Sequence, residues 1–376
     1  MAKAVLISAH IPNPRINKRI ESLSTLFEEL TVIYWNRDHG YNFSVEPVLG
    51  VKYNSLEGTN QRRLFRRYSE TRRLTKATYE MLAAEKPDCI YVSGIEGMFP
   101  AKKYKEKRKV KIILELGDLP ATSYKKYLRT LHNKLELFLN NLVSQADGLV
   151  LTSQYFYLDY YKRTVGFKEE NTFIFENVPR KAIFQDFQKQ AHKGFTIGFV
   201  GGVRYFDSLR TLFEACSGEA NLNVLVAGKG PDYERVLDES KKYANVKVTG
   251  PYNYTKDILR IYSTIDLVYS VYDTHNLNER IALPNRLYEA IVCETPIIAS
   301  ENTRLGKYVK DLGVGFTVSD NNVNELRDII RELSRNPILL QEASANASRI
   351  KEKFYYEHIE ENFGRWLRKR TGLRKM

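Results

Sequence analysis

Residues 282–290, Ala-Leu-Pro-Asn-Arg-Leu-Tyr-Glu-Ala, contain residue types that can bind a phosphate group and a sugar diol side by side. Pro284 favours the first turn of a helix, where free backbone N–H groups attract phosphate. Glu289 follows one turn later, and its carboxylate can accept hydrogen bonds from the hydroxyl groups of a ribose. The alternative interpretation is an ordinary helix that begins at a proline and carries a surface glutamate.

Two glycine-containing segments indicate places where a ligand can approach the backbone. Gly201 and Gly202 follow a run of apolar residues, and Arg204 can bind a diphosphate through the two prongs of its guanidinium. A tight connection with a solvated arginine would have the same sequence. Gly228 belongs to the second segment, Ala-Gly-Lys-Gly-Pro at 227–231, which resembles the start of a dinucleotide-binding fingerprint.

That fingerprint is incomplete. Tyr233 stands at its third glycine position, and no acidic residue ends the next expected strand, 246–250. We therefore exclude NAD and FAD as cofactors. Tyr252 follows the turn after that strand, where a nucleobase could stack on its ring.

In the first half of the chain, acidic residues follow two expected strands. Asp118 comes after the strand 111–116 and can act as a polar anchor or as a base, or simply cap a turn. Glu96 follows the strand 88–93 in the same way, and His10 follows the first strand. Because ligands of open α/β sheets bind at the carboxyl ends of strands, these side chains could share one site.

Residues 62–82 are expected to form a basic helix. Arg62, Arg66, Arg73 and Lys76 fall on one face of it. Such a face can bind a membrane surface or an anionic acceptor, and it can equally be a solvated face of a helix packed on its domain.

Strands and helices alternate along the chain, which predicts two α/β halves, each with a parallel sheet. The polar residues 181–194 lack this pattern and are expected to be the linker. The expected strands are 4–8, 30–35, 88–93, 111–116, 148–153, 173–177, 195–200, 222–227, 246–249, 267–270 and 295–300, and the expected helices include 17–29, 62–82 and 131–146.

Composition narrows the class of protein. The 376 residues are enough for two domains, and a net charge of +13 predicts an anionic partner. No RNA-binding or zinc-finger pattern is present, so we expect no nucleic-acid partner. The three isolated cysteines predict neither disulfides nor a zinc site. With no apolar run of about 18 residues and no secretory signal, the protein is expected to be cytoplasmic.

Taken in chain order, these segments resemble bacterial glycosyltransferases of the GT-B fold, in the family 4-like group that builds surface polysaccharides. The resemblance covers nearly the whole chain, and its most specific block joins 283–290 to 295–300, Thr-Pro-Ile-Ile-Ala-Ser. The other segments that carry it are 13–15 (Asn-Pro-Arg), 146–153 (Ala-Asp-Gly-Leu-Val-Leu-Thr-Ser), 176–179 (Glu-Asn-Val-Pro), 197–204 and 227–231.

The resemblance implies two Rossmann-like domains that face each other across a cleft. Residues 1–180 would bind the acceptor, and residues 195–353 would bind a nucleotide-sugar donor. A C-terminal helix, 354–376, would cross back to the N-terminal domain, where Trp366 and Leu367 would anchor it.

The implied reaction moves a sugar from a UDP- or GDP-type donor to a glycan or lipid-linked glycan, with retained configuration and without a metal or cofactor. Arg204 and Arg286 would neutralise the departing diphosphate, and Asp118 and Glu96 would orient the acceptor, which makes Asp118, Glu96 and Arg204 the candidate catalytic residues. A lipid-linked acceptor would bring the basic helix face to the inner membrane surface. The expected donor-binding residues are Gly201, Gly202, Arg204, Gly228, Tyr252, Asn285, Arg286, Leu287 and Glu289.

Three departures from the family pattern involve four positions. Ile281 replaces a frequent glutamate, Gly202 and Asp207 replace an arginine and a lysine for the donor phosphates, and Gly117 replaces a histidine. These departures keep two alternatives open. One is an inactive GT-B scaffold that binds a nucleotide or a glycan, and the other is a GT-B nucleotide-sugar epimerase.

Overall fold

The computed structural model describes residues 2–37, 44–59, 64–120 and 129–372. The chain forms two compact units. Unit 1 contains Met1–Glu176 and Glu360–Met376, and unit 2 contains Asn177–Ile359.

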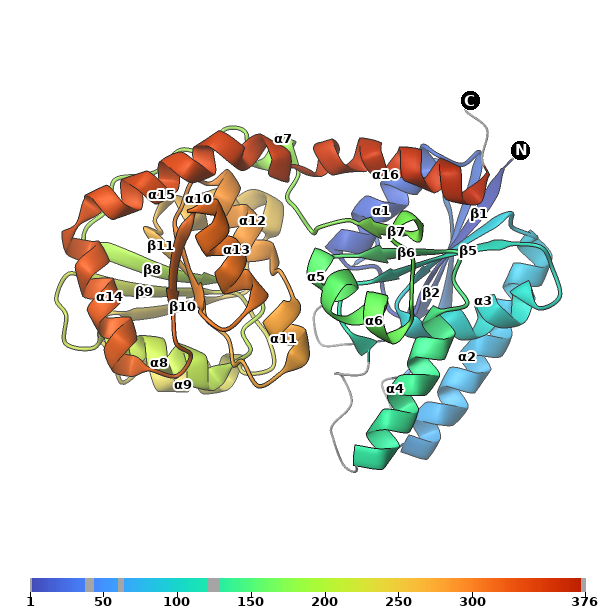
Figure 1. The fold of residues 1–376 in the computed structure, drawn as a ribbon, viewed down its shortest axis with the longest axis horizontal. Helices are drawn as coiled ribbons and strands as arrows, with labels where there is room; N and C mark the ends of the chain where they lie inside the picture. The colour runs from blue at the N-terminus through green and yellow to red at the C-terminus, as the bar shows by residue number, and fades with distance from the viewer. Residues whose placement is uncertain (1, 38–43, 60–63, 121–128, 373–376) are drawn as a thin grey trace. The chain divides into compact units, whose positions relative to one another are not determined.

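Unit 1 is built on a seven-stranded sheet in the order β3-β2-β1-β4-β5-β6-β7, and all its strand pairs are parallel (Figure 1). Its inner strands are buried on both faces, which explains their apolar runs. Strand order reverses between β1 and β4, so the carboxyl ends of these strands mark the expected ligand site. The strands are β1 (Lys3–Ser8), β2 (Glu29–Asn36), β3 (Lys52–Glu57), β4 (Cys89–Ser93), β5 (Lys111–Leu116), β6 (Gly148–Leu151) and β7 (Thr172–Ile174).

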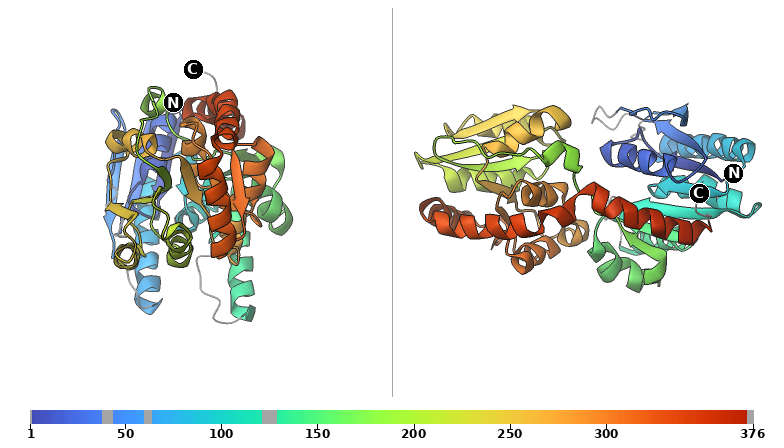
Figure 2. Two further views of the ribbon diagram at one scale, coloured as in Figure 1. Left: turned by 90° about the vertical axis from the view of Figure 1, so that its left-hand side faces the viewer. Right: turned by 90° about the horizontal axis from the view of Figure 1, so that it is seen from above.

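Helices flank both faces of this sheet (Figures 1 and 2). Helix α1 starts where the Asn13 side chain accepts a hydrogen bond from the Ile16 N–H at 3.1 Å, with Pro14 in the first turn. The helices are α1 (Pro14–Ser24), α2 (Leu64–Glu85), η1 (Ile95–Gly97), α3 (Met98–Lys105), α4 (Arg129–Val143), α5 (Gln154–Phe156), the π-helix η3 (Tyr157–Tyr161), α6 (Lys162–Thr164), η4 (Glu169–Asn171) and most of α16 (Tyr356–Thr371).

Unit 2 repeats the architecture with a six-stranded parallel sheet in the order β10-β9-β8-β11-β12-β13, which reverses between β8 and β11. The strands are β8 (Phe195–Val200), β9 (Leu222–Ala227), β10 (Val246–Gly250), β11 (Leu267–Ser270), β12 (Ile297–Ser300) and β13 (Gly315–Val318). The helices are α7 (Lys181–Phe184), α8 (Phe206–Cys216), α9 (Tyr233–Ser240), α10 (Tyr254–Ser263), α11 (Leu277–Ile281), α12 (Asn285–Val292), α13 (Arg304–Leu312), α14 (Val323–Arg335), α15 (Pro337–Ile350) and η5 (Lys351–Phe354).

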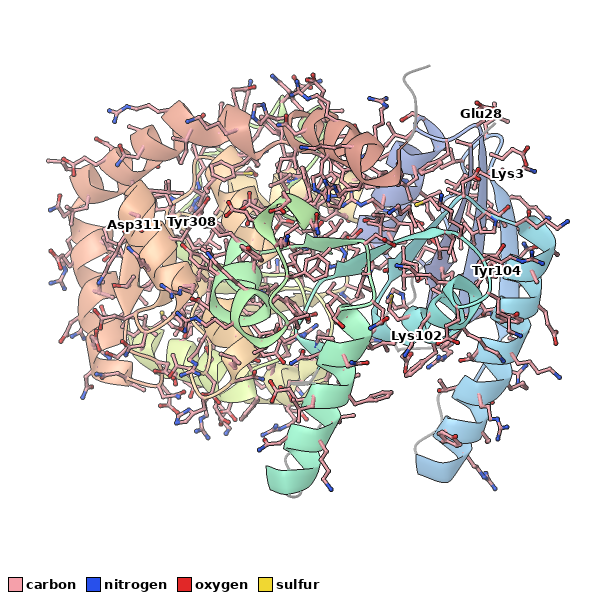
Figure 3. All side chains as sticks on the ribbon, turned by 45° about the vertical axis from the view of Figure 1, so that its right-hand side comes forward. Lys3, Glu28, Lys102, Tyr104, Tyr308 and Asp311 are labelled. Atoms are coloured by element: carbon pink, nitrogen blue, oxygen red, sulfur yellow. The ribbon has the colours of Figure 1, made fainter. Side chains whose placement is uncertain are left out.

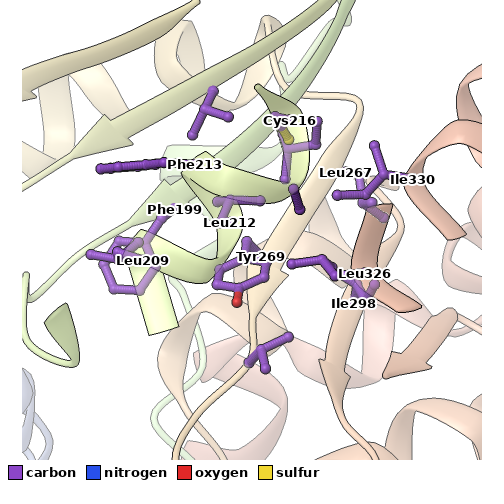
Figure 4. Packing of buried hydrophobic residues seen from close by; sticks show 14 of the residues in the cluster. Phe199, Leu209, Leu212, Phe213, Cys216, Leu267, Tyr269, Ile298, Leu326 and Ile330 are labelled. Carbon is purple, nitrogen blue, oxygen red and sulfur yellow. The ribbon is translucent and has the colours of Figure 1, made fainter. Parts of the chain in front are cut away.

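One apolar core of unit 2 lies between the sheet and the helices α8 and α14. Figure 4 shows Leu209 and Leu212 of α8 near Phe199 and Tyr269 of the sheet, all of them fully or almost fully buried. Burial of this area from water fixes α8, and so also the loop that leads into it from β8.

Helix α16 begins in unit 2 and continues into unit 1 from Glu360 onward. Within unit 1, Phe363 and Leu367 are completely buried, and Phe363 contacts the rings of Tyr91, Phe173 and Phe175. The indole of Trp366 donates a hydrogen bond to the Glu170 carbonyl at 3.3 Å.

The two parallel α/β sheets that the sequence predicts are confirmed, with three differences. Strands β3 and β13 were not expected. Residues 181–194, expected as a linker, belong to unit 2, because the chain passes between the units after Glu176. They form α7, whose Phe184 is 1% exposed. Within the described ranges, no helix has the length and apolar composition needed to cross a bilayer.

Candidate active site

The loop after β8, residues 201–205, is called here the glycine loop. Gly201 has a φ of +116° and donates its N–H to the Ala227 carbonyl at 2.9 Å. A Cβ on Gly228, whose φ is +138°, would lie 1.8 Å from the Gly201 carbonyl oxygen, and a Cβ on Gly230 would lie 2.3 Å from that of Val203. Gly228 and Gly230 therefore let the loops after β8 and β9 pack backbone against backbone.

Arg286 lies against the glycine loop. It is 7% exposed and donates from Nη1 to the Tyr269 carbonyl at 3.2 Å, and its guanidinium carbon lies 3.7 Å from the Phe199 ring centre. A Cβ on Gly201 would lie 3.6 Å from its Nη2. A cation is thus fixed at the point where strand order reverses in unit 2, an arrangement suited to an anionic ligand.

Arg204 and Tyr205 form the exposed side of the glycine loop. A Cβ on Gly202 would lie 3.6 Å from Nε and Nη2 of the exposed Arg204, so this second guanidinium also lies close to the loop backbone. Tyr205 adopts a left-handed conformation with a φ of +72°, and its ring lies 4.9 Å from that of Tyr272. Such strain in a non-glycine residue is frequent at functional sites.

Glu289 lies one turn beyond Arg286 on the same helix and is 5% exposed. Its carboxylate accepts hydrogen bonds from the Tyr254 hydroxyl at 3.0 Å and the Tyr262 hydroxyl at 2.8 Å. Burial, reinforced by this carboxylate, raises the pKa of both tyrosines, so they remain donors. The two hydroxyls hold the carboxylate in one orientation.

The remaining predicted donor-site residues lie at the carboxyl end of the same sheet, and two of them already make hydrogen bonds within the protein. The N–H of Leu287 is already donated to the Pro284 carbonyl at 3.0 Å, and the Asn285 side chain accepts from Asn177 at 2.8 Å. Tyr252 is half-buried, and burial followed by the nearby Glu289 charge raises its pKa. Its ring lines a groove of about 510 Å³ beside β9 and β10.

In unit 1, the predicted acids lie at the ends of neighbouring strands. Glu96, in η1, forms an ion pair of 3.2 Å with Arg37, whereas Asp118 is exposed after β5. His10 places Nδ1 2.8 Å from the Ile11 carbonyl.

Glu115, the other acid near the end of β5, was not among the predicted site residues, and it is completely buried beside Arg15 and Arg19. Burial would raise its pKa, but the two guanidiniums and the Tyr91 hydroxyl outweigh it and hold the pKa below its ordinary value.

The basic face of α2 is partly neutralised. Arg66 is exposed, whereas Arg73 pairs with Glu70 at 3.0 Å and Lys76 with Glu80 at 3.9 Å. Arg62 lies outside the described residues. The start of α2 and helix α4 project from unit 1 (Figure 3), and they expose the apolar side chains of Tyr68, Leu137 and Phe138.

Asp273, His275 and Asp320 form a group in unit 2 whose potential metal-ligand atoms lie within 4.8 Å of one another. His275 already contacts Asp273 at 2.5 Å, a contact that raises the pKa of the imidazole, and Asp320 accepts two hydrogen bonds from Thr274.

Two Rossmann-like sheets define a protein of the GT-B fold. Residues 181–350 match the family model described as "Glycosyl transferases group 1", and this range contains every predicted donor-binding residue. Residues 181–350 are thus a group 1 glycosyltransferase domain, and the fold of the chain as a whole is that of the GT-B proteins. No relative was found among curated proteins.

Solved structures with the same fold share little sequence with this chain. Sucrose-phosphate synthase from Thermosynechococcus elongatus is 15% identical, with a TM-score of 0.77 and coverage of 98% of this chain and 99% of the other. Anabaena Alr3699/HepE in complex with UDP-glucose is 14% identical, with a TM-score of 0.70 and coverage of 98% and 100%. WaaG, a glycosyltransferase involved in lipopolysaccharide biosynthesis, is 12% identical, with a TM-score of 0.68 and coverage of 96% and 98%.

Proposed function

We propose that this family 4-like enzyme transfers a sugar from a UDP- or GDP-type donor to a glycan or lipid-linked glycan in cell-surface polysaccharide synthesis, with retention and without a metal. The observation that carries the proposal is Arg286, a buried cation held against the glycine loop one turn before Glu289. The HepE complex with UDP-glucose favours a UDP donor, and the role of WaaG in lipopolysaccharide synthesis favours a surface polysaccharide.

In this proposal, the glycine loop binds the diphosphate. Arg286 is already desolvated and fixed, so it loses little entropy when an anion binds, and its charge counts for more than in water. Arg204 is exposed and closes on the diphosphate from the solvent side. Together the two cations stabilise the negative charge that develops on the leaving nucleotide.

Glu289 holds the ribose in the proposed complex. The Tyr254 and Tyr262 hydroxyls fix the orientation of its carboxylate, so the group is oriented before the ligand arrives. Asp118, exposed after β5, orients the acceptor. Glu96 has a lesser share in acceptor binding, because it is paired with Arg37.

We also propose that the protein associates peripherally with the inner face of the membrane. The support is the net charge of +13 and the projecting helices α2 and α4, which combine exposed Arg66 with exposed Tyr68, Leu137 and Phe138. Apolar side chains next to basic ones favour the interface of an anionic bilayer.

A thermal-shift screen over nucleotide sugars tests the donor site. A ligand at 100 times its Kd should stabilise the fold by about 2.7 kcal/mol. Arg204→Ala and Glu289→Ala should each weaken donor binding about 10-fold or more, because each removes a hydrogen-bonding group for the ligand. Arg210→Ala is the matched control, since Arg210 is an exposed arginine of α8 that pairs with Asp207 and Glu214.

Each outcome decides between the proposal and its alternatives. Unchanged donor affinity in both site variants would refute the site. Donor binding without hydrolysis or transfer across an acceptor panel would indicate an inactive scaffold, and an epimerised nucleotide sugar formed without acceptor would indicate an epimerase.

A further inference from the structure

Gly117, directly after β5, has no side chain of its own. The space is not empty. A Cβ built on Gly117 would lie 1.8 Å from Nη1 of Arg15 and 2.7 Å from its Cζ. Arg15 is the second residue of α1, so its guanidinium reaches from the first turn of that helix into the place of the missing side chain.

The buried Glu115 holds Arg15 in position. Its Nε lies 3.3 Å from the buried carboxylate of Glu115, which also binds Arg19 at 2.9 Å and Tyr91. Arg15 and Arg19 are one helical turn apart, so both guanidiniums point to one carboxylate. One negative charge thus faces two positive charges, and Arg15, with a side chain 19% exposed, is the cation nearer to solvent.

Other polar groups near these strand ends are buried and not used within the protein. Ser93 ends β4 beside Glu115 in the sheet register, is 1% exposed, and has an Oγ without a hydrogen-bond partner among the described residues. The hydroxyl of the fully buried Tyr161, in the π-helix η3, is also without such a partner. Buried polar groups are rarely left unsatisfied, so the Ser93 hydroxyl, on the strand next to Glu115, indicates that a ligand completes this part of unit 1.

We infer that Arg15, whose guanidinium occupies the space beside Gly117, binds a phosphate group of the acceptor. Its Nε forms an ion pair with Glu115 at 3.3 Å, and the two Nη groups, which lie beside Gly117, can donate to phosphate oxygens. Gly117 is itself held by a hydrogen bond of 2.9 Å from Thr152 Oγ1 to its carbonyl, so the space beside it keeps its shape. The inference rests on the proposed function, because it takes unit 1 as the acceptor-binding unit.

The test uses the full chain with saturating UDP, which occupies the proposed donor site, and inorganic phosphate as the probe. Isothermal titration should show saturable phosphate binding to the wild type and a Kd at least 10-fold higher for Arg15→Ala. Arg15→Lys should have an intermediate Kd for phosphate, since lysine keeps the positive charge but lacks the two parallel N–H donors of the guanidinium. Arg108→Ala, an exposed arginine near the opposite end of β5, is the control and should bind phosphate normally.

Gly117→Ala separates binding from stability. The three atoms nearest to the new methyl group all belong to the movable end of Arg15, so the melting temperature should change little while phosphate affinity falls as in Arg15→Ala. Competition by glucose 6-phosphate and by farnesyl diphosphate then tells a sugar phosphate from a lipid diphosphate. Tighter binding of either one supports the inference.

Equal phosphate affinity in the wild type, Arg15→Ala and Gly117→Ala overturns the inference. UDP binding is measured on the same proteins. If UDP binds normally and phosphate affinity is the same in the wild type and in Arg15→Ala, only this inference fails. If the wild type does not bind UDP or a nucleotide sugar, the proposed function fails, while phosphate binding that depends on Arg15 would still establish the anion site.

Discussion

At the scale of single residues, Gly228 is the position least able to accept a side chain near the glycine loop. We predict that Gly228→Ala destabilises unit 2 by about 3 kcal/mol or more, because it combines a φ of +138° with a Cβ 1.8 Å from the Gly201 carbonyl. Donor binding should be lost with it, since the glycine loop must move. Chemical denaturation and UDP titration measure both effects.

Gly166→Ala is the control for that prediction. Gly166 has a φ of +67° but open space around its Cβ position, so the same substitution should cost only about 1 kcal/mol. Equal costs at the two positions would mean that backbone conformation alone, and not the packing of two loops, requires a glycine at 228.

Glu115 predicts a dependence of stability on pH. Its pKa in the folded protein lies below 4.5, so the charged carboxylate stabilises unit 1 above that pH, and this stabilisation is lost as the pH falls through the folded pKa. Glu115→Gln should lose about 3 kcal/mol at pH 7, because Arg15 and Arg19 are left beside a neutral group, and should then vary less with pH between 5 and 3. Urea unfolding followed by hydrogen exchange in β5 measures this.

Glu361→Gln serves as the reference for the acid range, because Glu361 is exposed and only loosely paired with Arg365 at 3.8 Å. It should follow the wild-type pH profile. A Glu115→Gln profile as steep as that of the wild type would show that other carboxylates cause the acid sensitivity.

The distance along the chain decides which site residues the sequence could predict. Arg286 and Glu289 are three residues apart on one helix, so a local pattern was enough to place them together. Arg15 is about 100 residues away from Glu115 and Gly117 in the sequence. It meets them because α1 follows β1, and β1, β4 and β5 are neighbours in the sheet. The sequence did not indicate that Tyr254 and Tyr262 contact Glu289, because an aromatic residue on a helix usually packs in a core.

At the scale of elements, the inner strands were predictable because burial on both faces requires apolar runs. Strand β3, Lys-Tyr-Asn-Ser-Leu-Glu, lies at the sheet edge, has no buried residue and therefore has a polar composition. Strand β13 lies at an edge of the sheet of unit 2. With four residues, it is too short to show a pattern of apolar residues.

Helix α16 allows a prediction about an element. Phe363→Ala should destabilise unit 1 by about 3–5 kcal/mol, because a completely buried ring that contacts Tyr91, Phe173 and Phe175 is removed. Hydrogen exchange should rise in β4 and β7 and remain unchanged in unit 2. Arg365→Ala, on an exposed face of the same helix, should leave exchange in unit 1 at its original rate.

At the scale of the whole molecule, the net charge of +13 predicts binding to anionic vesicles and not to neutral ones. Replacing Arg66, Arg73 and Lys76 by glutamate should abolish this binding, since each basic residue near the surface contributes about 1 kcal/mol. High salt should have the same effect. Co-sedimentation with vesicles of each composition is the measurement.

The matched variant for the vesicle experiment changes Lys241, Lys242 and Lys256 of unit 2 to glutamate. It lowers the net charge by the same amount on exposed residues of unit 2. If both variants lose binding equally, attraction is a matter of overall charge and α2 is not a dedicated contact surface.

The division of unit 1 into two chain segments has a consequence for the order of folding during translation. Phe363 and Leu367, which complete the core of unit 1, leave the ribosome after all of unit 2, which is one continuous segment, Asn177–Ile359. The nascent protein can therefore finish its second unit before its first. Until Phe363 and Leu367 emerge, the surface around Phe173 and Phe175 stays uncovered, and a truncated product that ends before Glu360 exposes it permanently, which makes it a substrate for chaperones and proteases.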